Sequence, residues 1–171
     1  MRFEALIGDL SARFAGLPDG EVDQEIDPAL RALGEFLAVD RVALWDLDAQ
    51  GREFRIAHAW GEDAVRPAPR VVLVAQVPWA SARLLRGEPV SFSHLAGLPA
   101  EAAADVGFYR DAGLQAALML PLTLGGRILG ALSFAALRRE RDWPDALVRR
   151  LRLVAEIFGN ALARRRGAGP G

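Results

Sequence analysis

The sequence predicts an α+β domain. A central antiparallel sheet of five to six strands is expected to carry long terminal helices on one face. Short helices and loops are expected on the other face. Apolar residues recur at helical spacing at both ends of the chain. Between them, strand-like segments are separated by tight-turn residues, which predicts hairpins and therefore antiparallel pairing. The 171 residues are enough for one compact domain.

The first segment, residues 3–17, is predicted to be an amphipathic helix. Its apolar residues alternate three and four positions apart, which gives a narrow stripe like that of a heptad repeat. These residues are Phe3, Leu6, Ile7, Leu10, Phe14 and Leu17. A turn over residues 17–20 ends the helix.

The second helix has two candidate starts. It begins at Pro28 with Asp27 as its cap, or it begins near Glu21 and has a kink at Pro28. We favour the earlier start, because Val22 and Ile26 extend the apolar stripe of this helix.

The period then changes to that of β-structure. Residues 42–47 and 53–60 are rich in β-forming residues and flank a turn at 48–51, which predicts a hairpin. A proline-rich loop follows over residues 61–69. Residues 70–76 are expected to form a short third strand.

Two short helices and an extended piece come next. Pro78 opens the first helix, which stops at Gly87. Residues 89–92 are extended, and the second short helix covers residues 101–111.

The last strands carry the strongest signal. Residues 115–124 and 127–136 are joined by Gly125-Gly126, which predicts a tight hairpin. Both segments are nearly continuous in apolar residues, so both faces of the sheet should be covered. A long helix over residues 144–166 ends the domain.

Composition excludes several classes of protein. The chain has no cysteine, which excludes disulfides, thiolate metal sites, a cysteine nucleophile and thioether attachment of a chromophore. It has no lysine, which excludes a Schiff-base or P-loop lysine. A net charge of −1 gives no global attraction to nucleic acid. We expect no membrane insertion and a cytoplasmic location, since no secretory or membrane-spanning segment is recognisable.

Four ordered segments resemble the GAF domain, a sensory module of bacterial signalling proteins. They are FLAVDRVALW at residues 36–45, LMLPL at 118–122, GRILGALS at 126–133 and WPD at 143–145. The resemblance runs from residue 21 to residue 165. It implies a sensory, non-catalytic domain in which the short helices and loops roof a cavity.

The resemblance also suggests how the chain is divided. Residues 1–18 look like the lead-in, or dimerisation, helix of GAF domains in sensor histidine kinases and related regulators. Residues 19–166 are expected to be the GAF domain, and residues 167–171 a flexible tail or linker.

Departures from the family narrow the subtype. Bilin-binding relatives and relatives that reduce free methionine sulfoxide use cysteines, and this chain has none. The Asn-Lys and Asp-Glu signature of cyclic-nucleotide relatives is missing too. Some relatives ligate haem through a histidine. We expect neither haem nor a metal here, because His58 and His94 have no cysteines or paired carboxylates nearby. An unknown small ligand is the expected occupant.

Strand alternation supplies the first two candidate ligand-binding residues, His58 and Trp60. Over residues 53–60, the larger side chains share one face and two alanines share the other. Small residues suit a face pressed against long helices, so we assign the larger face to the cavity. The alternative is a hydrogen-bonded core histidine beside a packing tryptophan.

Four further residues are candidates for the cavity wall. They are Trp45, Trp79, His94 and Met119. For the tryptophans and Met119 the alternative is plain core packing. For His94 it is an exposed loop position.

The terminal helices predict a homodimer. The first helix has little else to bury, so its stripe is expected to meet a second subunit together with the last helix. The expected interface residues are Phe3, Leu10, Phe14, Leu151 and Phe158. The alternative is that both helices lie on the back of the sheet.

The sequence therefore predicts a sensory domain whose last helix transmits a signal to an output module. From the resemblance, that module is a histidine kinase, with a sigma-54-type activator next. One alternative is a ligand-free dimerising spacer. A weaker one is a small hydrolase using Ser91 or Ser93 with His94, although no nucleophile elbow surrounds either serine.

Overall fold

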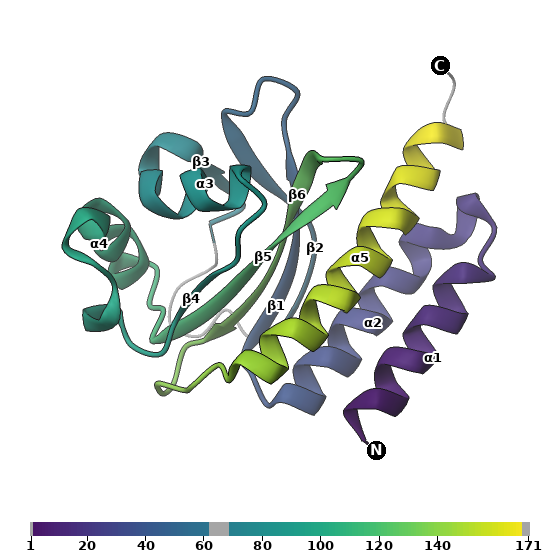
Figure 1. The fold of residues 1–171 in the computed structure, drawn as a ribbon, viewed down its shortest axis with the longest axis horizontal. Helices are drawn as coiled ribbons and strands as arrows, with labels where there is room; N and C mark the ends of the chain where they lie inside the picture. The colour runs from purple at the N-terminus through teal and green to yellow at the C-terminus, as the bar shows by residue number, and fades with distance from the viewer. Residues whose placement is uncertain (1, 62–68, 169–171) are drawn as a thin grey trace.

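The computed structural model describes residues 2–61 and 69–168. These residues form three layers, with the sheet between three long helices and a second group of two short helices (Figure 1). The long helices are α1 (Phe3–Ala15), α2 (Val22–Leu37) and α5 (Asp145–Ala168). The short ones are α3 (Pro78–Leu85) and α4 (Ala103–Asp111). Single 3₁₀ turns cover Asp19–Glu21, Val74–Gln76, Leu95–Gly97 and Ala100–Ala102.

The sheet has six strands in the order β3-β2-β1-β6-β5-β4. All neighbouring strands are antiparallel. The strands are β1 (Arg41–Leu47), β2 (Glu53–Gly61), β3 (Val71–Leu73), β4 (Val90–Phe92), β5 (Ala116–Leu124) and β6 (Arg127–Ala136). The predicted α+β class and antiparallel sheet are confirmed. Most of the loop expected over residues 61–69 lies outside the described residues, as does the end of the expected tail.

The early start of the second helix is confirmed, with Pro28 inside α2. An interior proline costs a helix about 3 kcal/mol, because it removes a hydrogen bond and its ring crowds the preceding turn. Val22, Ile26 and Leu30 are fully buried on the same stripe. Each such side chain contributes roughly 1.5–3 kcal/mol when buried, so their sum exceeds the cost of the proline.

The interface residues predicted for a dimer are buried within one chain. Relative exposure is 7% for Phe3, 1% for Leu10, 2% for Phe14, 0% for Leu151 and 1% for Phe158. The prediction that these five residues face a second subunit is therefore wrong. Helix α1 finds its partner surface within the chain.

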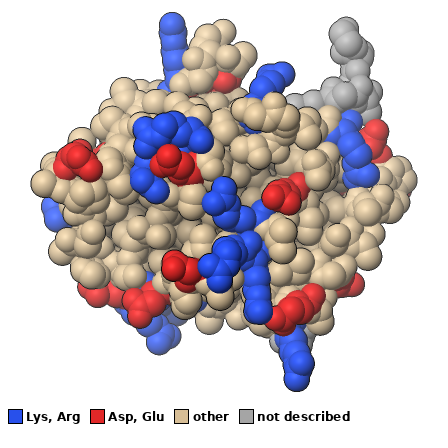
Figure 2. Space-filling model, in the orientation of Figure 1, with Lys and Arg blue, Asp and Glu red and all other residues tan. Residues whose placement is uncertain are grey.

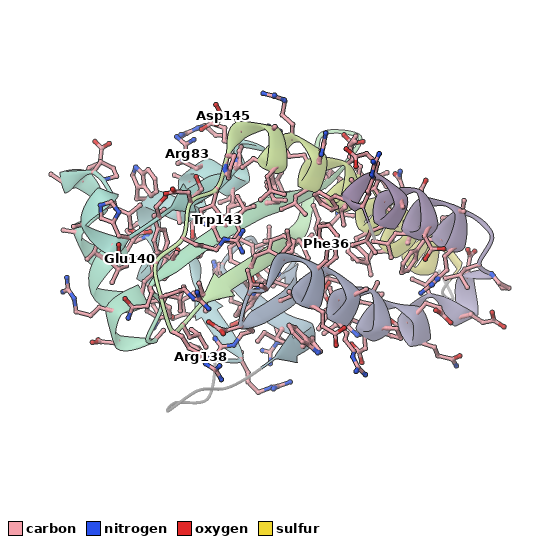
Figure 3. The ribbon with its side chains drawn as sticks, turned by 90° about the horizontal axis from the view of Figure 1, so that it is seen from below. Phe36, Arg83, Arg138, Glu140, Trp143 and Asp145 are labelled. Atoms are coloured by element: carbon pink, nitrogen blue, oxygen red, sulfur yellow. The ribbon has the colours of Figure 1, made fainter. Side chains whose placement is uncertain are left out.

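Helix α1 packs against α5 and α2 through aromatic pairs. The Phe14 and Phe158 rings meet edge to face at 5.4 Å between centroids, and the Phe3 ring stacks on Phe36 at 5.2 Å. Phe36 lies between the ribbons of α1 and α2 in the view from below (Figure 3). The stripe that resembles a heptad seam is thus one side of a three-helix layer.

Within the described residues, no helix is both long enough and apolar enough to cross a bilayer. On the face drawn in Figure 2, acidic and basic side chains are interspersed. This mixed surface agrees with the formal net charge of −1.

Candidate functional site

A cavity lies between the sheet and the short helices. Its volume is about 100 Å³. Its floor consists of small residues on the central strands, namely Ala117 on β5 and Ala131, Ser133 and Ala135 on β6. Larger side chains at these positions would fill the space, so the short side chains of the floor create the hollow.

Helices α3 and α4 form the roof of the cavity. The roof residues on α3 are Ala80, Ser81 and Leu84, and those on α4 are Phe108 and Tyr109, with Ala112 just beyond it. The remaining wall residues are Arg41, Trp45, Phe54, Pro69, Val72, Val77, Leu114, Met119 and Phe134.

A buried carboxylate fixes the two roof helices to each other. Asp105 of α4 is fully buried and accepts hydrogen bonds from the backbone N–H groups of Trp79 (3.1 Å) and Ala80 (2.9 Å). These amides belong to the first turn of α3, where the helix dipole also favours a negative charge. The bonds offset the cost of burying Asp105, so the roof holds together as one unit.

Polar groups are few and buried in this cavity. Trp45 donates its indole N–H to Ser133 Oγ at 2.9 Å. Tyr109 donates its hydroxyl to Met119 Sδ at 3.5 Å, which is a weak bond because sulfur is a poor acceptor. Burial, together with the nearby Asp105 carboxylate, raises the pKa of Tyr109 well above its ordinary value. The phenol is therefore a neutral donor throughout the physiological pH range.

Ser81 is the most unusual polar residue of the cavity wall. Its side chain is 1% exposed, and Oγ has no hydrogen-bond partner in the described structure. Leaving a buried hydroxyl unsatisfied costs roughly 1–3 kcal/mol. A cavity occupant that offers an acceptor to Ser81 would recover part of that cost.

Two of the six predicted ligand-binding residues, Trp45 and Met119, line the cavity. The prediction for Trp79 and His94 is wrong, because neither is part of the wall. Trp79 is half-buried in the roof, where its ring lies 5.4 Å from the Arg83 guanidinium. His94 is exposed.

The prediction for His58 and Trp60 is wrong because of a bulge in β2. Leu44 pairs with His58 but the next residue of β1, Trp45, pairs with Ile56, so Ala57 is an extra residue on β2. A bulge of one residue reverses the alternation of side chains beyond it. Phe54 therefore faces the cavity, whereas His58 faces α2.

On the α2 side, both residues have specific partners. His58 Nδ1 lies 2.9 Å from Asp27 Oδ1, and Nε2 lies 3.3 Å from Asp23 Oδ1. The Trp60 ring occupies the space above Gly34, where any side chain on that residue would collide with it. The alternative of a hydrogen-bonded histidine beside a packing tryptophan describes the observed arrangement.

The family of this domain follows from sequence comparison. The family model for the GAF domain matches residues 21–162. The chain belongs to the GAF domain family. A search of the curated proteins found no match.

Solved structures similar to this GAF domain share its fold at low sequence identity. The phycocyanobilin-bound GAF domain of a cyanobacterial phytochrome has a TM-score of 0.81 and 12% identity, over 100% of this chain and 99% of that one. The GAF domain of an Acinetobacter phosphoenolpyruvate-protein phosphotransferase has a TM-score of 0.75 and 12% identity, over 97% and 95%.

One of the solved structures that share this fold is an enzyme. The free methionine-R-sulfoxide reductase of Neisseria meningitidis, in complex with its substrate, has a TM-score of 0.76 and 14% identity, over 98% of this chain and 92% of that one. The similarity to all three structures concerns the fold.

The residues proposed for a hydrolase are not assembled in this GAF domain. Ser91 and His94 are exposed, and within the described residues no hydrogen bond joins Ser91 or Ser93 to His94. The part of the chain that the structure describes also has no group of three or more His, Cys, Asp or Glu side chains suited to a metal ion.

Sequence reasoning missed most of the cavity wall. Arg41, Ser81 and Tyr109 carry its polar chemistry, and none of them was predicted. One available signal was Arg41, a charged residue at the start of an apolar strand. Another was the alternation of Ala131, Ser133 and Ala135 on β6, because small residues in a central strand leave room above the sheet.

Two hydrogen bonds connect the roof side of the GAF domain to its last helix. Trp143, two residues before α5, donates its indole N–H to the carbonyl of Phe92 on β4 at 3.2 Å. Arg152 of α5 donates to the carbonyl of Gly87, just beyond α3, at 3.3 Å. Figure 3 shows the connection to α5, which runs from Arg138 through Glu140 and Trp143 to Asp145.

Proposed function

We propose that this GAF domain is a sensory module that binds a small ligand in the cavity beneath α3 and α4. The observation that carries the proposal is the cavity itself, since it is lined mainly by apolar side chains and has a buried, unsatisfied hydroxyl at Ser81 in its wall. Ligand sites have this composition, with a few polar groups that orient the occupant. One similar structure is a bilin-bound GAF domain and another is a reductase bound to its substrate. Both proteins share this fold and bind small molecules, which supports the proposal of a ligand here.

The signal is proposed to leave through α5. Bonds from Trp143 to Phe92 and from Arg152 to Gly87 tie this helix to the elements next to the roof. A ligand that favours one position of the roof would therefore favour one position of the start of α5. Such a ligand acts only through its different affinity for the two states, and coupling of this kind is typically about 1–3 kcal/mol.

In the full protein, α5 is proposed to lead to an output module in the cytoplasm. A histidine kinase is the first candidate and a sigma-54-type activator the second. This part of the proposal rests on the family and on its sensory relatives, including a phytochrome and a phosphotransferase.

A filled-cavity variant tests the proposal. Ala131→Leu places a larger side chain on the cavity floor, whereas the control Ala12→Leu makes the same change at an exposed position on α1. A thermal-shift screen of nucleotides, amino acids, haem and aromatic acids should give at least one compound that raises the Tm. The shift should persist in Ala12→Leu and disappear in Ala131→Leu. A compound whose shift is the same in both variants binds elsewhere and contradicts the proposal.

A further inference from the structure

Two hydroxyl groups in the cavity wall lack a good hydrogen-bond acceptor. Ser81 of α3 is 1% exposed, and its Oγ has no partner within the described structure. The Tyr109 hydroxyl of α4 donates to Met119 Sδ at 3.5 Å, and thioether sulfur is a weak acceptor. Buried polar groups are nearly always hydrogen-bonded in folded proteins. These two positions therefore indicate an occupant that supplies an acceptor.

The contact between the roof helices brings the two hydroxyl residues to one small space. Asp105 and Tyr109 are four residues apart on α4, so they lie on the same face of that helix. Asp105 accepts a hydrogen bond from the amide of Ala80, the residue before Ser81 on α3. Ser81 and Tyr109 both line the cavity of about 100 Å³. A ligand that fills so small a volume contacts both parts of the roof.

The charges of the wall favour a neutral occupant. None of the described lining residues carries a carboxylate, so a ligand cation would find no counter-charge there. Arg41, the one arginine among these lining residues, already interacts with other groups of the chain. A ligand anion would have to compete with that interaction. Burying a charge without a partner is unfavourable, whereas a neutral oxygen acceptor needs only hydrogen-bond donors.

The volume and the apolar walls limit the rest of the ligand. A cavity of about 150 Å³ takes benzene, whereas this one has about 100 Å³. That volume suits about four or five non-hydrogen atoms. The floor includes Ala117, Ala131 and Ala135, and Trp45 and Phe54 add aromatic surface. The rest of the ligand is therefore a short hydrocarbon.

We infer that the cavity binds a small neutral carbonyl compound, a short ketone or ester, whose oxygen accepts a hydrogen bond from Ser81 and whose hydrocarbon lies on the alanine floor. A carbonyl oxygen has two lone pairs, so Tyr109 can donate to it as well and gains a better acceptor than Met119. This inference rests on the proposed function and adds the chemical class of the ligand.

Three probes of similar size test the class, namely butanone, 2-methylbut-1-ene and propanoate. The alkene has a methylene group in place of the carbonyl oxygen of the ketone, and propanoate carries a negative charge. NMR titration of the backbone amides measures each Kd and shows where each probe binds. We expect butanone to shift the amides of α3 and α4. Propanoate should bind at least about tenfold more weakly, because its charge has no partner in the cavity.

Ser81→Ala separates a hydrogen bond from simple filling of the cavity. It removes an unsatisfied hydroxyl, so the Tm without ligand should stay the same or rise. The Kd of butanone should rise about threefold to tenfold, because one hydrogen bond is lost. The Kd of the alkene should stay the same or fall. The matched control Ser11→Ala removes a hydroxyl from an exposed position of α1, outside the cavity, and should change neither Kd.

Tyr109→Phe covers the case in which Ser81→Ala does not fold. It removes the second donor and keeps the ring, so the Kd of butanone should again rise relative to that of the alkene, about twofold to tenfold. If the only folded variant changes both Kd values by the same factor, the inference is overturned.

Failure of the inference differs from failure of the proposed function. The ligand class is wrong if Ser81→Ala changes the Kd of butanone and of the alkene by the same factor, or if propanoate binds more tightly than butanone. It is also wrong if neither butanone nor the alkene binds. In each case the proposed function stands or falls separately, on the screen with Ala131→Leu and Ala12→Leu.

Discussion

Tyr109 is the one tyrosine of the chain, and its hydroxyl is a probe of the roof. Burial raises its pKa, with the Asp105 carboxylate as a second cause, so the folded protein keeps this phenol protonated where an unfolded chain would ionise it. The stabilising effect is complete below the ordinary pKa of tyrosine, about 10, and is lost as the pH rises beyond it.

An alkaline titration followed by ultraviolet absorbance tests this environment. Every tyrosinate signal comes from Tyr109, since the chain has one tyrosine. Because burial raises the pKa of this residue, tyrosinate should form only together with unfolding, well above pH 10. Tyr109→Phe should withstand alkaline pH better than the wild type when unfolding is followed by circular dichroism. Reversible ionisation near pH 10 in the folded protein would mean that the roof is open to water.

Ala57, the extra residue of the bulge in β2, shows why the candidate site was only partly predictable. Alternation along β2 correctly indicated that large side chains alternate with small ones, but one extra residue moves His58 and Trp60 to the opposite face from Phe54. A bulge leaves little trace in a sequence, because no residue type is required at it. The assumption that small residues face the long helices was also wrong, since Ala117 of β5 and Ala131 and Ala135 of β6 line the cavity.

At the scale of elements, the contact between α2 and β2 depends on a missing side chain. The Trp60 ring fills the position that a Cβ on Gly34 would need. Trp60 is partly buried and packed against the core on the helix side, so displacing its ring would lose those contacts.

Two glycine variants isolate this contact. Gly34→Ala should destabilise the domain by about 1–3 kcal/mol, because overpacking exceeds the gain in helix propensity. Gly8→Ala makes the same change in α1, where an added Cβ meets nothing within 4 Å. It should stabilise by up to about 1 kcal/mol. Chemical denaturation of both variants measures the two free energies of unfolding, and equal values would contradict the packing argument.

The stripe of α1 leads to a second prediction for elements. Since Leu10 and Phe14 are buried against the chain's own core, the double variant Leu10→Glu, Phe14→Glu should lose several kcal/mol of stability. Thermal unfolding measures the loss, and light scattering gives the mass. If the variant keeps the wild-type Tm but changes its mass, the result would instead indicate that these residues form a dimer contact.

At the scale of the whole molecule, the order of elements, the hairpins and the α+β class followed from local patterns. Helical and strand periods are properties of neighbouring residues, and Gly125-Gly126 specifies a tight turn without reference to the rest of the chain. The position of α1 against the rest of the molecule could not be predicted from local patterns. Its stripe fits another helix equally well within the chain or in a second copy, and only the assembled surface of α2 and α5 decides between them.

The packing of α1 has a practical consequence for fusions of this GAF domain to a reporter protein. A fusion joined at residue 19 would lack α1 and would expose the apolar surfaces of α2 and α5 that α1 covers, which promotes aggregation. A junction placed ahead of Phe3 keeps α1 packed over that surface, so fusion proteins should be joined there.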